Sequence, residues 1–214
     1  MNVFLGPYFE VMEAAIDVVG VDQVIVEDRP TSAETINLAE RYGIRASILA
    51  KDEPLTAVWP DHAELALVAG FGRLLRQSVL TRLKHAINFH PAIVEQNRGR
   101  HGLLTAALHG HEMMGITCHV IDTEEIDAGP IIAQYRVPID YSANFDANHD
   151  RLRKAFEPMA RLVLSDYKGS GKFTALPWTA TEESYYPPLS PDQVRKVLDS
   201  PTLGSLYPGM RRER

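Results

Sequence analysis

The sequence has few of the features that mark secreted, membrane-spanning or nucleic-acid-binding proteins. It holds one cysteine in 214 residues, Cys118, so no internal disulfide framework can form, and its place in the apolar run 116–121 predicts a small buried side chain. No apolar run reaches about 18 residues, so no membrane span is expected. The first twenty residues lack a basic region before an apolar stretch, so a secretory signal is not expected either, and we predict a cytoplasmic protein.

Basic residues are also in deficit, with 22 Lys and Arg against 28 Asp and Glu and a formal charge of −6. This balance gives no broad attraction to phosphate backbones, so we expect a small-molecule substrate and no nucleic-acid partner. The single basic cluster is formed by Arg211, Arg212 and Arg214 at the terminus, where side chains are usually solvated. A hydrophobic content of 45% is enough for one domain of ordinary core size, and the oligomeric state, including a homodimer, stays open.

Apolar runs alternate with helical patterns along the first seventy residues. Runs at 3–5, 24–26, 46–49 and 65–69 predict short strands. Helices are expected from about Tyr8 to Val18, and from a cap at Thr31 or Ser32 to Gly43. Right-handed crossovers would make these elements an α/β fold, with a mostly parallel, Rossmann-like sheet and helices on both faces. Ligands on such a fold bind outside the carboxyl ends of the strands.

Three polar residues have the chemistry for acyl transfer to an amine. Attack of an amine on a carbonyl needs a donor toward the oxyanion and an acceptor for the proton. Asn88 and His90 lie two residues apart before Pro91 and would share one face at a strand end; Asp127 stands in an Asp-Ala-Gly turn. Asn88 and a protonated His90 could supply the donors and Asp127 the acceptor, or the three residues could merely close two turns.

The segment 65–138 resembles the formyltransferases that use N10-formyltetrahydrofolate. The matching runs are LALVAGFGRLL, INFHPAIVEQNRG and GITCHVIDTEEIDAGPIIAQYRVPI. The resemblance implies a formyltransferase core over residues 1–168 and makes Asn88, His90 and Asp127 the catalytic trio. It also implies a pterin pocket whose walls are Gly72, Arg73, Leu74, Leu75 and Leu80 on one side and Thr123, Glu124, Glu125 and Ile126 on the other. The chain departs from the family at Ala92–Gln96, where a small serine and Leu-Leu-Pro are usual.

Two other ligand classes fit the sequence less well. Gly70-Phe71-Gly72 suggests a dinucleotide fingerprint, but Leu75 stands where glycine or alanine is needed, so nicotinamide binding is rejected. Histidines are dense between His85 and His119, yet none has the spacing of a metal site. We expect His119 on a strand near the site, and His101 and His109 toward solvent or the acceptor.

The last third of the sequence predicts a helix that packs in the core, followed by an appended segment. A helix from about Asn144 to Tyr167 should bury one face and be kinked or divided at Pro158. Beyond Gly169 the composition shifts to Pro, Tyr and Ser, which predicts an irregular appended segment, 169–214. The expected buried face comprises Leu152, Ala155, Phe156, Met159, Leu162 and Val163.

The activity implied is transfer of the formyl group of N10-formyltetrahydrofolate to the primary amine of a small molecule. Gly6-Pro7-Tyr8 replaces the phosphate loop of glycinamide ribonucleotide enzymes, and a basic domain like that of the initiator-tRNA enzymes is not expected. The segment 185–191 resembles the section after the core in sugar formyltransferases, although packing against the core would explain it equally well. The resemblance favours an amino sugar on a nucleotide carrier, ahead of an amino acid or natural-product amine. A formyltetrahydrofolate hydrolase and a non-catalytic folate-binding protein remain alternatives.

Overall fold

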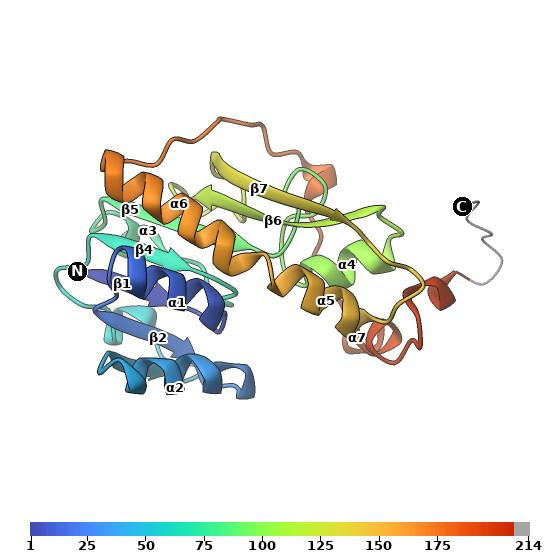
Figure 1. The fold of residues 1–214 in the computed structure, drawn as a ribbon, viewed down its shortest axis with the longest axis horizontal. Coiled ribbons are helices and arrows are strands. Elements are labelled where there is room, and N and C mark those ends of the chain that lie inside the picture. Colours follow the sequence, from blue (N-terminus) through green and yellow to red (C-terminus); the bar gives the residue numbers. More distant parts are fainter. Residues whose placement is uncertain (208–214) are drawn as a thin grey trace.

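The computed structural model describes residues 1–207, which form a seven-stranded sheet in the order β3-β2-β1-β4-β5-β6-β7 (Figure 1). The first five of these strands are parallel to one another, and β6 is antiparallel to both of its neighbours, β5 and β7. This confirms the predicted mostly parallel α/β sheet. The strands are β1 (Asn2–Leu5), β2 (Gln23–Glu27), β3 (Arg45–Leu49), β4 (Leu65–Val68), β5 (His85–His90), β6 (Met113–Val120) and β7 (Ile131–Pro138).

The two faces of the sheet are covered unequally. One large core joins the sheet to six helices, α1, α2, α4, α5, α6 and α7, of which α1 and α6 cross in front of the strands in Figure 1. The opposite face is covered by one short helix and by the irregular segment 50–64, whose Trp59 and Ala63 are buried. The helices are α1 (Phe9–Val18), α2 (Ala33–Arg41), α3 (Gln77–Leu80), α4 (Gly102–Leu108), α5 (Phe145–Arg153), α6 (Phe156–Ser170) and α7 (Pro191–Leu198).

The helix predicted over 144–167 is divided into α5 and α6. The break falls at Lys154–Ala155, and Pro158 lies in the first turn of α6, where a missing N–H leaves no hydrogen bond unmade. One residue of the predicted buried face is wrong, because Leu162 is 70% exposed and Leu164 is buried in its place. Ser32 precedes α2 as expected, but its hydroxyl donates to Glu27 O and does not cap the helix.

The C-terminal segment wraps around the core and is less irregular than predicted. Leu176 forms an isolated bridge with Ile131, which extends the β7 edge. Helix α7 then packs against α4 and α5, and Val197 and Leu203 are fully buried. Residues 172–207 therefore complete the hydrophobic core. The basic cluster of Arg211, Arg212 and Arg214 lies outside the described residues.

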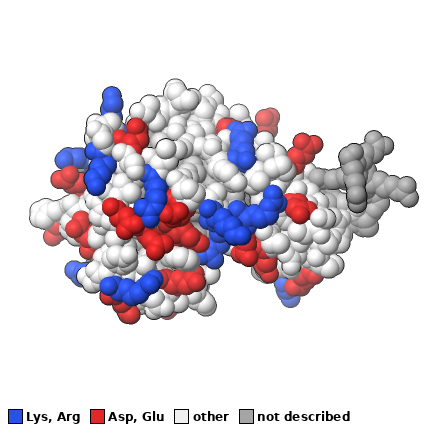
Figure 2. All heavy atoms as spheres, in the orientation of Figure 1, with Lys and Arg blue, Asp and Glu red and all other residues white. Residues whose placement is uncertain are grey.

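Charges of both signs alternate on the surface over α1, α5 and α6 (Figure 2). Arg161 on α6 contacts Asp17 of α1 at 2.7 Å, and Arg153 of α5 pairs with Glu10 of α1. On this face, basic and acidic side chains neutralise one another locally. Within residues 1–207, no helix is both long and apolar enough to cross a bilayer.

Candidate active site

Strand β5 ends by presenting two polar side chains to the same side of the sheet. Ile87 and Phe89 are buried in the larger core, so Asn88 and His90 project to the opposite face. Asn88 pairs in register with His119 of the antiparallel β6. The pairing of β5 with β6 thus brings a second imidazole beside the predicted trio.

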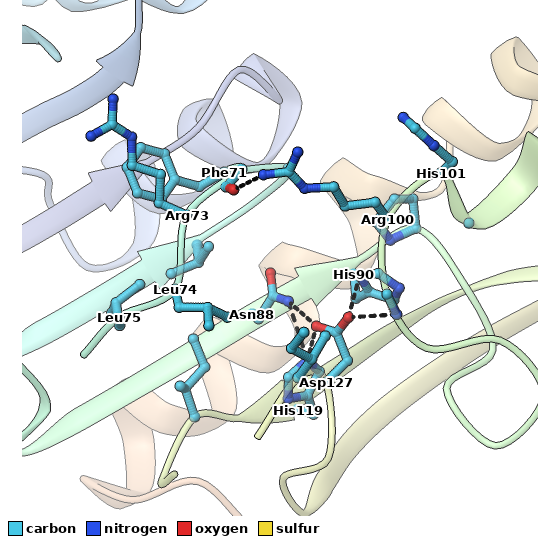
Figure 3. A pocket seen from close by; sticks show the side chains of 18 of the residues that line it. Phe71, Arg73, Leu74, Leu75, Asn88, His90, Arg100, His101, His119 and Asp127 are labelled. Carbon is cyan, nitrogen blue, oxygen red and sulfur yellow. Dashed lines mark hydrogen bonds and ion pairs between the residues drawn. The ribbon is translucent and has the colours of Figure 1, made fainter. Parts of the chain in front are cut away.

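Asp127 completes the cluster from the loop between β6 and β7. Its backbone is left-handed, with φ of 48°, a conformation that aspartate adopts more readily than most residues. Gly129 follows because a Cβ there would lie 1.8 Å from Val120 O. Asn88 Nδ2 donates to Asp127 Oδ1 at 3.1 Å, and His90 Nδ1 lies 3.5 Å from Oδ2 (Figure 3). The structure therefore brings Asn88, His90 and Asp127 together as expected.

His119 lies close to two members of this cluster, Asn88 and Asp127. Its Nε2 lies 3.2 Å from Asn88 Nδ2 and 3.4 Å from Asp127 Oδ1, and its Nδ1 lies 2.9 Å from Val120 O. Because a carbonyl only accepts, Nδ1 carries a proton and donates to Val120 O, while Nε2 faces both the Asn88 amide and the Asp127 carboxylate. Figure 3 shows the amide nitrogen of Asn88 directed toward Asp127 and His119 and its oxygen directed away from them.

Burial decides the protonation of His90. It lowers the pKa of His90 below the usual 6.5, an effect that the Asp127 carboxylate offsets in part. Burial also raises the pKa of Asp127, but His90, His119 and the Gly99 N–H outweigh it, so the pKa of this carboxyl falls well below its usual range. At neutral pH we therefore assign an ionised Asp127 and a neutral His90, whereas the sequence had predicted a charged His90. His90 Nε2 is buried and has no hydrogen-bond partner among the described residues.

The cluster lies at the base of a cavity of about 610 Å³. Leu75 is buried in its wall, and Leu74 is 40% exposed at its edge. Leu80 lies outside the cavity, because α3 directs it into the smaller core. The other residues expected to contact the pterin do line the cavity: Gly72, Arg73, Leu74, Leu75, Thr123, Glu124, Glu125 and Ile126.

The comparison with known proteins decides the family, since the family model described as formyl transferase matches residues 17–162. The chain belongs to the formyl transferase family. It is 31% identical over 147 residues to a phosphoribosylglycinamide formyltransferase of Mycobacterium tuberculosis, covering 65% of this chain and 66% of that protein. It is 30% identical over 171 residues to the methionyl-tRNA formyltransferase of Thermus thermophilus, covering 78% and 54%.

Solved structures agree on the fold of this formyl transferase chain. A sugar 3N-formyl transferase, WlaRD, superposes with a TM-score of 0.71 at 15% identity, covering 87% of this chain and 69% of that one. Such low identity supports the fold alone. The chain spans between about half and two thirds of the length of the curated relatives it matches.

One buried arginine fixes the loop after β5 in this formyl transferase chain. Arg98 is 5% exposed and donates to Ile126 O at 2.9 Å, beside Asp127, and to Thr181 O at 2.8 Å in the C-terminal segment. Its own N–H and C=O pair with Ser184 and Tyr186. Arg98 therefore joins the loop after β5, the Asp127 loop and the C-terminal segment.

Several residues of the cavity were missed from the sequence. Glu27 ends β2, and Tyr8, Arg29 and Arg100 follow β1, β2 and β5. Helix α5 adds Phe145, His149 and Leu152. The turns after β1 and β2 could have been found, because parallel strands end at one edge of the sheet. His101 lines the cavity, whereas His109 is exposed and packs against Tyr186. Within residues 1–207, no group of three His, Cys, Asp or Glu side chains is arranged to hold a metal ion.

Proposed function

We propose that this chain transfers the formyl group of N10-formyltetrahydrofolate to a primary amine of a small molecule. The observation that carries the proposal is the convergence of Asn88, His90 and Asp127 at the end of β5, on the floor of a cavity large enough for a drug-sized ligand. An amide donor, an unpaired imidazole nitrogen and an ionised carboxylate are the groups that formyl transfer between nitrogens requires.

The reaction begins when the neutral amine attacks the formyl carbon and places negative charge on the formyl oxygen. Asn88 donates to this oxyanion through an N–H of its amide nitrogen, Nδ2, which lies 3.2 Å from His119 Nε2. Asp127 Oδ2 lies 3.5 Å from His90 Nδ1 and orients the imidazole. The ionised Asp127 receives the proton of the new ammonium, directly or through water, and the proton passes to N10 as the carbon–N10 bond breaks. The products are the formamide and tetrahydrofolate.

The folate would enter between the Gly72–Leu75 wall and the 123–126 loop. A Cβ at Gly72 would lie 2.9 Å from Glu27 Oε1, so a glycine is needed here for the Glu27 carboxylate to accept the Gly72 N–H at 2.8 Å and hold this wall in place. Leu75 and Ile126 supply apolar surface for a flat ring, and the carbonyl and N–H groups of both loops supply its polar contacts. Among structural neighbours, a Helicobacter canadensis N-formyltransferase was solved with folinic acid and dTDP-3-aminofucose.

For the acceptor, we infer an amino sugar on a nucleotide carrier. Tyr185 and Pro188 of the segment that resembles sugar formyltransferases line the cavity, which supports this choice. The turn after β1 is closed, since a Cβ at Gly6 would lie 2.0 Å from Ala69 O. That turn leaves no loop of the kind that glycinamide ribonucleotide enzymes use for phosphate.

The test is release of tetrahydrofolate from N10-formyltetrahydrofolate against 4-amino-sugar nucleotides, 3-amino-sugar nucleotides, glycinamide ribonucleotide, amino acids and a control without amine. Turnover is expected with an amino-sugar nucleotide. Asn88→Ala and His90→Ala should each lower it by about 10²- to 10³-fold while the thermal transition is retained. Unchanged turnover in both variants would refute the mechanism.

The same assay decides between the proposed transferase and its alternatives. Turnover without amine identifies a hydrolase in which water is the acceptor. Turnover only with an amino acid would support formyl transfer to an amine but identify an amino acid, and not an amino sugar, as the acceptor. Folate binding with no turnover against any amine identifies a binding protein.

A further inference from the structure

Two arginines from different turns converge on one short stretch of the cavity wall. Arg29 follows β2, and its Nη2 donates to Gly70 O at 2.9 Å. Arg100 lies in the loop after β5, and its Nη2 donates to Gly72 O (Figure 3). We propose that these two guanidinium groups bind a phosphate or diphosphate group of the amine acceptor. The inference rests on the proposed function and specifies where the anionic part of that substrate lies.

Both arginines keep donors for a ligand. Arg100 is exposed, and within residues 1–207 it has no carboxylate at ion-pair distance. Arg29 shares Nη2 with Glu27, but its Nε is buried and has no hydrogen-bond partner in the described part of the chain. A guanidinium offers five N–H donors in a planar fork that matches phosphate oxygens. A buried donor without a partner in a cavity wall calls for a ligand or water.

Basic side chains gather on one side of the cavity, where Glu27 lies among them and pairs with Arg29. Figure 3 shows Arg73, Arg100 and His101 along one side and Asp127 with His119 on the other. The guanidinium of Arg73 is committed to the carbonyl groups of Ala50 and Glu53. This leaves Arg100, together with the donors of Arg29 that Glu27 does not engage, to bind an anion on that side.

The start of α1 is closed to an anion. Glu10 lies in the first turn of this helix and accepts a hydrogen bond from Arg153 Nε at 2.7 Å. The ring of Tyr8 fills the space above Gly70, where a Cβ would meet it at 2.4 Å. A carboxylate of the chain already occupies the helix start, so a phosphate there would meet a like charge. The acceptor's anion must then be held elsewhere, and Arg29 and Arg100 offer donors beside Gly70 and Gly72.

The position of Arg100 in the chain joins anion binding to the reaction. Gly99, the preceding residue, donates its N–H to Asp127 Oδ2 at 3.0 Å. An anion bound by Arg100 is therefore held next to Gly99, the residue whose N–H binds the catalytic carboxylate of Asp127. Such remote contacts orient an acceptor for attack.

Isothermal titration of the full chain with inorganic pyrophosphate and orthophosphate tests the proposal without requiring turnover. We expect Arg29→Gln and Arg100→Gln each to weaken pyrophosphate binding about tenfold or more, since each removes charge-assisted hydrogen bonds. The matched control is Arg45→Gln, because Arg45 is exposed at the amino end of β3 and has no ion pair among the described residues. Its affinity should equal that of the wild type.

A parallel titration with 5-formyltetrahydrofolate separates the two possible sources of an anion. The proposal expects unchanged folate affinity in all variants. Weaker folate binding with unchanged pyrophosphate binding would assign the arginines to the glutamate carboxylates of folate and overturn the proposal. Equal pyrophosphate affinity in the wild type and in folded Arg100→Gln would overturn it as well. If the arginine variants lose pyrophosphate binding but the wild type transfers no formyl group to any amine, the anion site is supported and the proposed activity is rejected.

Discussion

The N–H of Gly99 donates to Asp127 Oδ2 over 3.0 Å and joins the loop after β5 to the loop after β6. Gly99 can do this because its φ is +98°, a region that glycine enters without steric cost. The backbone also passes very close to the C-terminal segment there. A Cβ on Gly99 would lie 2.5 Å from Tyr186 O.

Gly99→Ala should therefore harm both stability and the site. We expect about 2–4 kcal/mol of lost stability, from the strained φ and from displacement of the Tyr186 backbone. The control is Gly20→Ala, whose φ is also positive, at +77°, but whose Cβ would meet nothing within 4 Å. That variant should lose only about 1 kcal/mol. Denaturant unfolding measures both, and equal losses would show that contact with Tyr186 is not important.

The ionised Asp127 should raise the pKa of the neighbouring imidazole. Since its charge opposes the effect of burial on His90, Asp127→Asn should move the pKa of His90 still further below 6.5. NMR titration of the imidazole signals, with His90→Gln to identify the resonance, measures the shift. Asp122→Asn in the same exposed loop is the control and should leave the pKa unchanged. A rise of the His90 pKa in Asp127→Asn would contradict the assignment.

The sequence predicted the elements whose information is local. The strand end 88–91 placed Asn88 and His90 on one face because side chains alternate along any strand. Arg29 and Arg100 were missed because their proximity depends on how β2 and β5 are spaced in the sheet, which no local pattern encodes. The predicted charge of His90 was wrong for a related reason. Burial by segments distant in sequence removes water from the imidazole and lowers its pKa. Leu162 fitted the helical stripe, but no element packs over that position.

Cys118 should be inert toward thiol reagents in the folded protein. It is fully buried on β6, and burial raises the pKa of its thiol well above the usual value, so little thiolate forms and no reagent reaches it. We expect negligible modification at pH 8 and rapid modification in guanidinium chloride. Because this is the one cysteine of the sequence, the labelling rate in intermediate denaturant reports how often β6 opens. Fast labelling without denaturant would show that the β5–β6 pairing is unstable.

Arg98 should be irreplaceable by lysine, although the charge is retained. Its guanidinium reaches Ile126 O, Thr181 O and Ser184 Oγ at once, from a position that is 5% exposed. A lysine has one ammonium group on a flexible stem and cannot satisfy these acceptors together.

We therefore expect Arg98→Lys to lose about 2–4 kcal/mol of stability, because buried acceptors are left without donors. Hydrogen exchange should then rise in 123–127 and 181–186 together, since both segments depend on the same side chain. Arg45→Lys, on the exposed edge of β3, is the control and should change neither quantity. Exchange that rises in only one of the two segments would show that Arg98 does not couple the C-terminal segment to the Asp127 loop, and that each segment is held by its own contacts.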